Sequence, residues 1–397
     1  MPFPNTHAPY ARVPHTDASH MDASVAARSA DTSGGEHAEK RRRVLALLDA
    51  ASANAVALTS QAALAWYLQG ARTHVSLAGG PIVAAVVDRD GEAVHVTSNE
   101  EHRLVAEELP SWAQPVVVAH PWHRDVVATA EAQALAAGGL REEALAAGLR
   151  NARQSLHAEE AARYRILGRD VARLLTRELA AARPDEAEAD LAARLTAGVV
   201  DLGAEPLVVL VGGDSRAAHR HPLPTRAPLG RRAMAVVCAR RHGLILNITR
   251  WVRFGPRTAD ERTADARILG VEAVYLSGSR PGGSLQRAFD AGTAAYLANG
   301  FASDEWTRHH QGGVAGYAGR DPRALPGLDL GLGTDVAFAW NPTAAGCKVE
   351  DTILSTQGGF EVLSVDPEWP TVASVVPASH DGAWAPQVLD RPDVLEL

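Results

Sequence analysis

The sequence predicts a mixed α/β (α+β) protein of two domains, and three observations carry that prediction. The chain has 397 residues, a length that fits roughly two domains of ordinary size. Helical and strand-like patterns alternate between about residues 40 and 150, whereas from about residue 155 two helices followed by strands occur twice over. Hydrophobic residues make up 46% of the chain and charged residues 22%, as in globular proteins that bury a sizeable core.

The first 38 residues differ in composition from the rest of the chain. Residues 1–38 are rich in Ser, His, Asp, Pro and Gly without apolar periodicity, so we expect a disordered N-terminal extension. Apolar residues then recur at helical spacing, and residues 39–154 are predicted to form the first α/β domain. The dipeptide Asp90-Gly91 between two apolar runs is a strong β-hairpin signal. A helix is predicted over 99–109, and strands over 55–60, 81–88, 92–98 and 115–121.

The second domain is predicted to cover residues 155–397. Its first helix carries an apolar stripe and ends at Pro184, and its second helix ends at Gly203. The elements predicted after it are strands 207–213, 233–239 and 243–250, helices 258–276 and 284–299, and strands 334–340 and 347–356. The order of two helices followed by a sheet occurs twice along the chain. This order predicts a duplicated half-domain with a pseudo-two-fold repeat.

Composition excludes several classes of protein. A net charge of −8 and a pI near 6.1 argue against a nucleic-acid partner, because phosphate neutralisation needs clustered Lys and Arg. Two cysteines are too few for a disulfide scaffold. No apolar run reaches the ~18 residues of a membrane span, and the N-terminus lacks the apolar core of a signal peptide. We therefore expect a cytoplasmic protein that acts on a small-molecule substrate, with no membrane partner.

Four segments of the second domain combine strand patterns with imidazole or other polar side chains. They are HRHPLPT (219–225), VVCARRHGLILNITRWVRFG (236–255), RHHQGGVAGYAGRD (308–321) and AFAWNPTAAGCKVEDTIL (337–354). Polar groups in a sheet core are costly unless they are used. In this order and spacing the segments resemble the pita-bread family, which includes creatinase, prolidase, aminopeptidase P and methionine aminopeptidase. The resemblance covers about residues 155–365 and implies a pita-bread C-terminal domain after a creatinase-like N-terminal domain.

The resemblance also shows where this chain departs from the family's metal site. The family holds two divalent ions with two Asp, one His and two Glu. At those places this sequence has Cys238, Asn247, Gly313, Asn341 and Glu350. One carboxylate cannot hold a dinuclear centre, because hard divalent ions need charged oxygen ligands. We therefore expect no metal and no other cofactor, and an enzyme that is not a metallopeptidase.

Losing the metals leaves histidine chemistry open, since creatinase has this fold and uses no metal. The family's HxP motif supplies a substrate-site histidine and matches His221. An imidazole can take a proton from water and return it to a leaving nitrogen, and we assign His221, His310 and Glu350 to catalysis. Adjacent residues of an extended segment point to opposite faces, so only one of the two neighbouring histidines is expected to face the site. The expected substrate-binding residues are His309, Gln311, Arg250, Arg240, Tyr317, Arg320, Trp340, Asn341 and Cys238.

Plainer interpretations stand beside several of these assignments. An ion pair of Arg250 with Glu350 or Asp351, filling the place of the lost metals, is an equal alternative to substrate binding. For three of the other residues the interpretation as ordinary members of the core is favoured over a role in the site, namely Tyr317, Trp340 and Cys238.

These residues predict a metal-independent enzyme that acts on a small polar molecule. The expected reaction is hydrolysis of a non-peptide C–N bond, as in an amidine, a lactam or a cyclic amide. Two alternatives stay open: a proton-transfer lyase, isomerase or cyclase at the same site, and a non-catalytic binding protein. The resemblance further implies a homodimer in which the N-terminal domain of one subunit lies near the site of the other.

Overall fold

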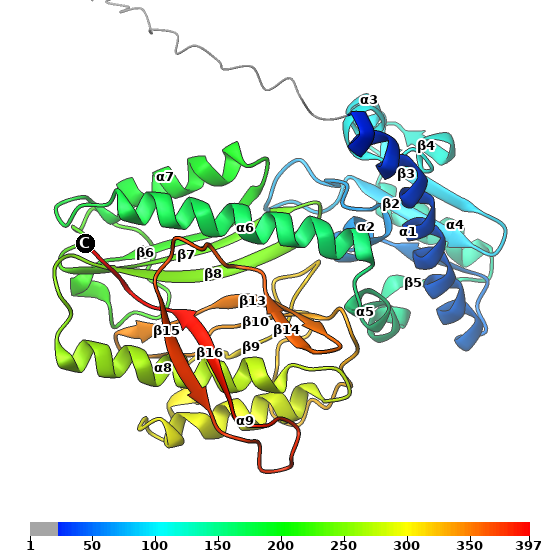
Figure 1. The fold of residues 1–397 in the computed structure, drawn as a ribbon. Coiled ribbons are helices and arrows are strands. Elements are labelled where there is room, and N and C mark those ends of the chain that lie inside the picture. Colours follow the sequence, from blue (N-terminus) through cyan, green and yellow to red (C-terminus); the bar gives the residue numbers. More distant parts are fainter. Residues whose placement is uncertain (1–22) are drawn as a thin grey trace, which may run out of the picture.

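The computed structural model describes the backbone of residues 23–397 and the side chains from residue 35 onward. Figure 1 shows a smaller N-terminal part, which contains α1 to α5, beside a larger C-terminal part in which helices cover the outer faces of two sheets. No helix within residues 23–397 is both long and apolar enough to cross a membrane.

The N-terminal part is built on a five-stranded sheet in the order β4-β3-β2-β1-β5. The predicted hairpin is confirmed, because β2 and β3 pair antiparallel and the Asp88 carboxylate accepts the backbone N–H groups of Asp90 and Gly91 at 2.8 and 2.7 Å. The strands are β1 (Ala55–Leu58), β2 (Val83–Asp88), β3 (Glu92–Thr97), β4 (Val117–His120) and β5 (Leu140–Arg141). The helices are α1 (Ala23–Ala50), α2 (Gln61–Tyr67), α3 (Glu101–Arg103), α4 (Val126–Ala136) and α5 (Ala146–Gln154).

The expectation of a disordered extension over residues 1–38 is wrong for its described part, because α1 covers it; residues 1–22 lie outside the described residues. Glu36 and Lys40 of α1 are each 1% exposed and form an ion pair of 2.5 Å. Arg163 of the C-terminal part donates two further hydrogen bonds to Glu36, at 2.9 and 3.0 Å. The segment has too few apolar residues to predict burial, and it docks through paired charges instead.

The C-terminal part confirms the repeat of two helices followed by strands. The first half contains α6 (Ala158–Ala180), α7 (Glu188–Asp201), β6 (Glu205–Gly212), β7 (Arg232–Arg241) and β8 (Leu244–Arg253). The second half contains α8 (Ala259–Gly278), α9 (Leu285–Ala298), β9 (Gly312–Val314), β10 (Ala337–Trp340), β11 (Thr343–Ala344), β12 (Cys347–Lys348), β13 (Asp351–Thr356) and β14 (Gly359–Val362). In Figure 1, α6 and α7 lie over the first sheet and α8 and α9 under the second.

The two sheets of the C-terminal part are joined where β8 passes the start of β13. The Thr249 N–H donates to the Glu350 carbonyl at 3.0 Å, and Thr352 Oγ1 bonds both the N–H and the carbonyl of Asn247 at 2.9 Å. The sheet orders are β17-β8-β7-β6 and β14-β13-β10-β9. The polar residues predicted for the site lie on and around this junction.

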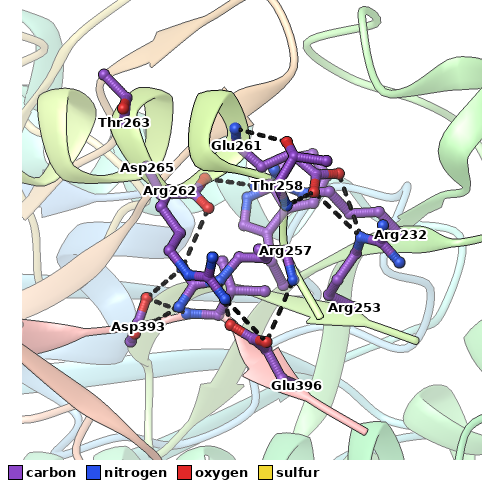
Figure 2. A network of polar contacts seen from close by, with 12 residues as sticks. Arg232, Arg253, Arg257, Thr258, Glu261, Arg262, Thr263, Asp265, Asp393 and Glu396 are labelled. Carbon is purple, nitrogen blue, oxygen red and sulfur yellow. Dashed lines mark hydrogen bonds and ion pairs between the residues drawn. The ribbon is translucent and has the colours of Figure 1, made fainter. Parts of the chain in front are cut away.

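The C-terminal segment closes the domain through strands that the sequence patterns did not predict. A hairpin of β15 (Thr371–Val376) and β16 (Gln387–Pro392) crosses α8, and β17 (Leu395–Glu396) pairs with β8. Figure 2 shows Arg257 at the centre of the contacts that hold this end. Its guanidinium group binds both oxygens of Asp393 at 2.6 and 2.7 Å, Glu396 at 2.7 Å and Asp265 at 3.3 Å.

Candidate active site

Three histidine side chains form a cluster close to the junction of the two sheets. His221 lies on the loop after β6, and His309 and His310 lie between the 3₁₀ turn Glu305–Arg308 and β9. The ring centre of His221 lies 4.6 Å from that of His309 and 5.8 Å from that of His310. The ring centres of His309 and His310 are 4.3 Å apart. The expected alternation of faces is not seen, because regular strand geometry begins only at β9, and both neighbouring rings approach His221.

Hydrogen-bond partners assign the tautomers in this cluster. His309 Nδ1 lies 2.5 Å from the carbonyl oxygen of His310, which can only accept, so Nδ1 carries the proton. His309 Nε2 then has a free lone pair and accepts the Nε2–H of His221 at 3.0 Å, which leaves the lone pair of His221 on Nδ1. His310 Nδ1 is buried without a hydrogen-bond partner among the described residues. A buried ring nitrogen without a protein partner is a group whose bonding a water or a ligand completes.

Burial and neighbouring cations keep all three rings neutral at physiological pH. Burial and the ammonium group of Lys348 lower the pKa of His309 to about 2. Burial and nearby guanidinium groups lower the pKa of His310 to about 4. The pKa of His221 is lowered by burial and by Lys348. The cluster therefore offers unprotonated nitrogens rather than imidazolium charges.

Glu350 is the only carboxylate among the five positions that the resemblance assigns to metal ligands. It is 2% exposed, accepts the Thr249 hydroxyl at 2.9 Å, and forms an ion pair with Arg320 at 2.8 Å. Burial by itself raises the pKa of Glu350, but the charges of Lys348 and Arg320 outweigh burial and lower it. Its carboxylate is thus charged, and it is already paired with the guanidinium group of Arg320.

Lys348 is a site residue that sequence reasoning missed. It lies on β12, is buried, and interacts electrostatically with Glu350, Cys238 and Arg320 as well as with each histidine of the cluster. Burial lowers the pKa of Lys348, and the carboxylate of Glu350 opposes that shift. The signal was present in the sequence, because a residue two positions before Glu350 shares its face of an extended segment.

The remaining positions of the implied metal set do not fit divalent ions. Cys238 faces Asn247 across the β7–β8 pair, and burial together with the Glu350 charge raises the pKa of its thiol to about 12. A neutral thiol and a neutral amide replace two carboxylates. Asn341 is also buried, and its Oδ1 has no hydrogen-bond partner among the described residues.

Gly313 leaves no room for a ligand side chain. Its φ is +145°, and an added Cβ would lie 2.4 Å from the Pro322 carbonyl oxygen and 2.7 Å from the Ala324 nitrogen. Gly312, with φ +130°, is as tightly confined, since its Cβ would lie 2.3 Å from the Ala339 carbonyl oxygen. The backbone at this place therefore excludes the imidazole that the resemblance implies, and the five positions together cannot hold a dinuclear metal centre.

The two predicted arginines outside the cluster are committed to partners elsewhere. Arg250 donates to Asp351 at 2.8 Å and to the Ser364 carbonyl at 2.7 Å, which favours the alternative of an internal ion pair over substrate binding. Arg240 donates to Glu205 at 2.6 Å and contacts His74 at 3.0 Å, so these partners lie outside the histidine cluster.

Three further predicted binding residues belong to the core. Tyr317 donates to Glu160 at 2.5 Å and is buried, and Trp340 stacks on Tyr275 while its indole N–H bonds Ser279 at 2.8 Å. The Gln311 amide is used in full: its oxygen accepts from tyrosine hydroxyls, and its nitrogen donates to the carbonyls of residues 306 and 309 at 2.8 and 2.7 Å. The predicted residues that the structure does bring together are His221, His309, His310, Arg320, Glu350 and Cys238.

Comparison with known proteins identifies the fold. No family model matches the chain, and no curated protein matches its sequence. A dipeptidase from Mycobacterium ulcerans is similar in structure, with a TM-score of 0.68 and 18% identity over 84% of this chain and 96% of that one. The prolidase from Pyrococcus horikoshii OT3 has a TM-score of 0.67 and 16% identity over 82% of this chain and 98% of its own.

An Xaa-Pro dipeptidase from Bacillus anthracis is similar over 91% of this chain and all of its own, with a TM-score of 0.66 and 13% identity. The likeness spans both the N-terminal and the C-terminal parts, as the coverage requires. Identities this low establish the architecture and leave the chemistry to the residues of the site. The chain therefore has the pita-bread fold of the prolidases and Xaa-Pro dipeptidases.

Proposed function

We propose that this protein is a metal-independent enzyme that hydrolyses a non-peptide C–N bond of a small polar molecule, such as an amidine, a lactam or a cyclic amide. One arrangement carries the proposal: a cluster of neutral histidines, reached from solvent at His221, lies beside the buried cation Lys348. This pairing joins a proton acceptor to a fixed positive charge, and the proposed reaction needs no metal.

The histidines supply proton transfer. His221 Nδ1, which bears the lone pair, accepts a proton from the attacking water and afterwards donates it to the leaving nitrogen. His309 orients this ring, because its Nε2 accepts the Nε2–H of His221 at 3.0 Å and its own Nδ1–H is held by a carbonyl at 2.5 Å. His310 Nδ1 gives the substrate a second, unpaired nitrogen to hydrogen-bond.

The cations supply electrostatic stabilisation. As water adds to the carbon of the C–N bond, negative charge develops on the attached oxygen or nitrogen, and a fixed ammonium held by the protein stabilises that charge. Lys348 fills this role, while Glu350 holds Arg320 at 2.8 Å and favours the charged form of Lys348. Glu350 thus acts through the two cations rather than as a proton carrier.

The proposal is tested with chelator-treated protein and a panel of amidines, lactams, cyclic amides and proline dipeptides, with release of ammonia or amine as the readout. We expect turnover of a member of the first three classes without added metal. His221→Ala should lower that turnover ~100–10,000-fold, the usual cost of a lost acid or base. His219→Gln is the matched control, because His219 is exposed two residues away and lies outside the cluster.

Two results would contradict the proposal. Hydrolysis of proline dipeptides only after addition of divalent metal would indicate a metallopeptidase. Tight binding of a panel compound without any hydrolysis of it would indicate a binding protein instead.

A further inference from the structure

We propose that His221, His309 and His310 form a binding site for one transition-metal ion of the Zn²⁺ type, separate from the five positions implied by the fold. One nitrogen from each ring can be chosen so that all three lie within 4.8 Å of one another. The inference concerns binding alone. An ion on these nitrogens would occupy groups that the proposed metal-free reaction uses, so the metal-bound state is not the catalytic one.

The spacing of the nitrogens is close to that of a tetrahedral ion. Bonds of about 2.0 Å to imidazole nitrogen require ligand atoms about 3.3 Å apart in tetrahedral geometry. His221 Nε2 and His309 Nε2 are already 3.0 Å apart, so this pair needs only a small separation. The third nitrogen lies within 4.8 Å of the other two, so it needs a shift of at most about 1.5 Å, which rotation of a side chain on a loop supplies.

The hydrogen bonds around His309 prepare it as a ligand. Its Nδ1–H donates to the carbonyl oxygen of His310 at 2.5 Å, which fixes the ring and directs the lone pair of Nε2 into the cluster. Metal-binding histidines commonly have such an outer hydrogen bond from the second ring nitrogen. His221 becomes a ligand when its proton moves from Nε2 to Nδ1, a tautomer change that a solvent-exposed imidazole makes through water.

The unsatisfied nitrogen of His310 is an independent observation that points to a ligand. Its Nδ1 is buried without a hydrogen-bond partner among residues 35–397. Three imidazoles without a carboxylate select Zn²⁺, Co²⁺, Ni²⁺ or Cu²⁺ over Mg²⁺ and Ca²⁺, which prefer oxygen. Three protein ligands also leave a fourth position open toward solvent at His221.

Neighbouring charges set the strength of binding. The ammonium of Lys348 acts on all three rings and repels a dication, whereas the carboxylate of Glu350 acts on His221 and His310 and attracts one. Removal of the Lys348 charge should therefore tighten metal binding, while the histidine ligands stay in place.

The experiment titrates Co²⁺ into the full-length, chelator-treated protein and follows the visible absorption that tetrahedral Co²⁺ acquires, with displacement by Zn²⁺ as a second readout. We expect one Co²⁺ per chain. His309→Gln and His221→Gln should each weaken binding by more than the ~10–100-fold that loss of an outer-shell partner causes. Lys348→Met should strengthen binding, and His219→Gln should leave it unchanged.

Several outcomes would overturn the inference. They are absence of the absorption band, two ions per chain, binding that persists in His221→Gln, or an affinity unaltered in Lys348→Met. Because His221 is exposed, its substitution leaves the fold intact, and a thermal melt of that variant verifies this independently of metal. Failure of the proposed hydrolysis would leave these binding results unchanged, so the two proposals fail separately.

Discussion

Replacement of Glu350 by glutamine isolates the role of its charge, because glutamine keeps the size of the side chain and can still accept the Thr249 hydroxyl. The carboxylate is 2% exposed, pairs with Arg320 at 2.8 Å, and interacts with the buried ammonium of Lys348. Removal of one partner from a buried ion pair costs about 3–5 kcal/mol, since the other charge stays buried without compensation. Deprotonation of Lys348, whose pKa is already lowered by burial, relieves part of that penalty, so we expect about 3 kcal/mol.

The assay is thermal unfolding of Glu350→Gln beside the parent and two controls. At about 2–4 °C per kcal/mol for a domain of this size, Tm should fall by roughly 6–12 °C. Thr249→Val removes one hydrogen bond and should cost about 1 kcal/mol. The double variant Glu350→Gln/Arg320→Met removes both partners and should recover part of the loss. A Glu350→Gln protein whose Tm lies within 1–2 °C (roughly 0.5 kcal/mol) of the parent's would show that the Glu350 charge is not needed to stabilise the buried cations beside it.

Three further outcomes are expected. Burial by itself raises the pKa of Glu36, but hydrogen bonds from Arg163 and the charge of Lys40 outweigh burial and lower the pKa to about 2. The ionised carboxylate of Glu36 therefore stabilises the fold by about 3 kcal/mol above pH 4.5, and this contribution is lost as the pH falls toward 2. Acid titration of unfolding should therefore show a flatter slope in Glu36→Gln. Arg257→Met should cost about 3 kcal/mol and expose the amides of β17 to hydrogen exchange, because it leaves the carboxylate of Asp393 without its guanidinium partner. Light scattering at micromolar concentration should give twice the mass of one chain, as the proposed homodimer requires, and a monomer would contradict it.

Local patterns predicted much of the fold because local chemistry determines those elements. The turn at Asp90-Gly91 is fixed by the Asp88 carboxylate, which lies two and three residues before its N–H donors, so four residues contain the whole signal. The docking of α1 escaped prediction, since the partner of Glu36 lies on α6, 127 residues further along the chain. The closing strands escaped as well, because β15 and β16 pack against α8 with one face exposed and show no clean apolar alternation.

In the candidate site, too, local motifs could be predicted and contacts between distant segments could not. The order of motifs predicted that His221, His310 and Glu350 lie in one region, which the electrostatic contacts between them support. The sequence could not show which polar side chains form hydrogen bonds or ion pairs inside the core and are therefore not free to bind a substrate. Arg250 meets Asp351 only after β8 and β13 have been brought together.

The positive-φ backbone at Gly312 and Gly313 has a consequence for redesign of this protein. A Cβ added at position 313 would lie 2.4 Å from the Pro322 carbonyl oxygen and 2.7 Å from the Ala324 nitrogen, so any side chain placed there forces the main chain of residues 322–324 to move. Exchange of the other four implied positions to acids would therefore not complete a five-ligand set by itself. An engineered dinuclear centre would require the loop at residues 322–324 to be rebuilt together with the ligands.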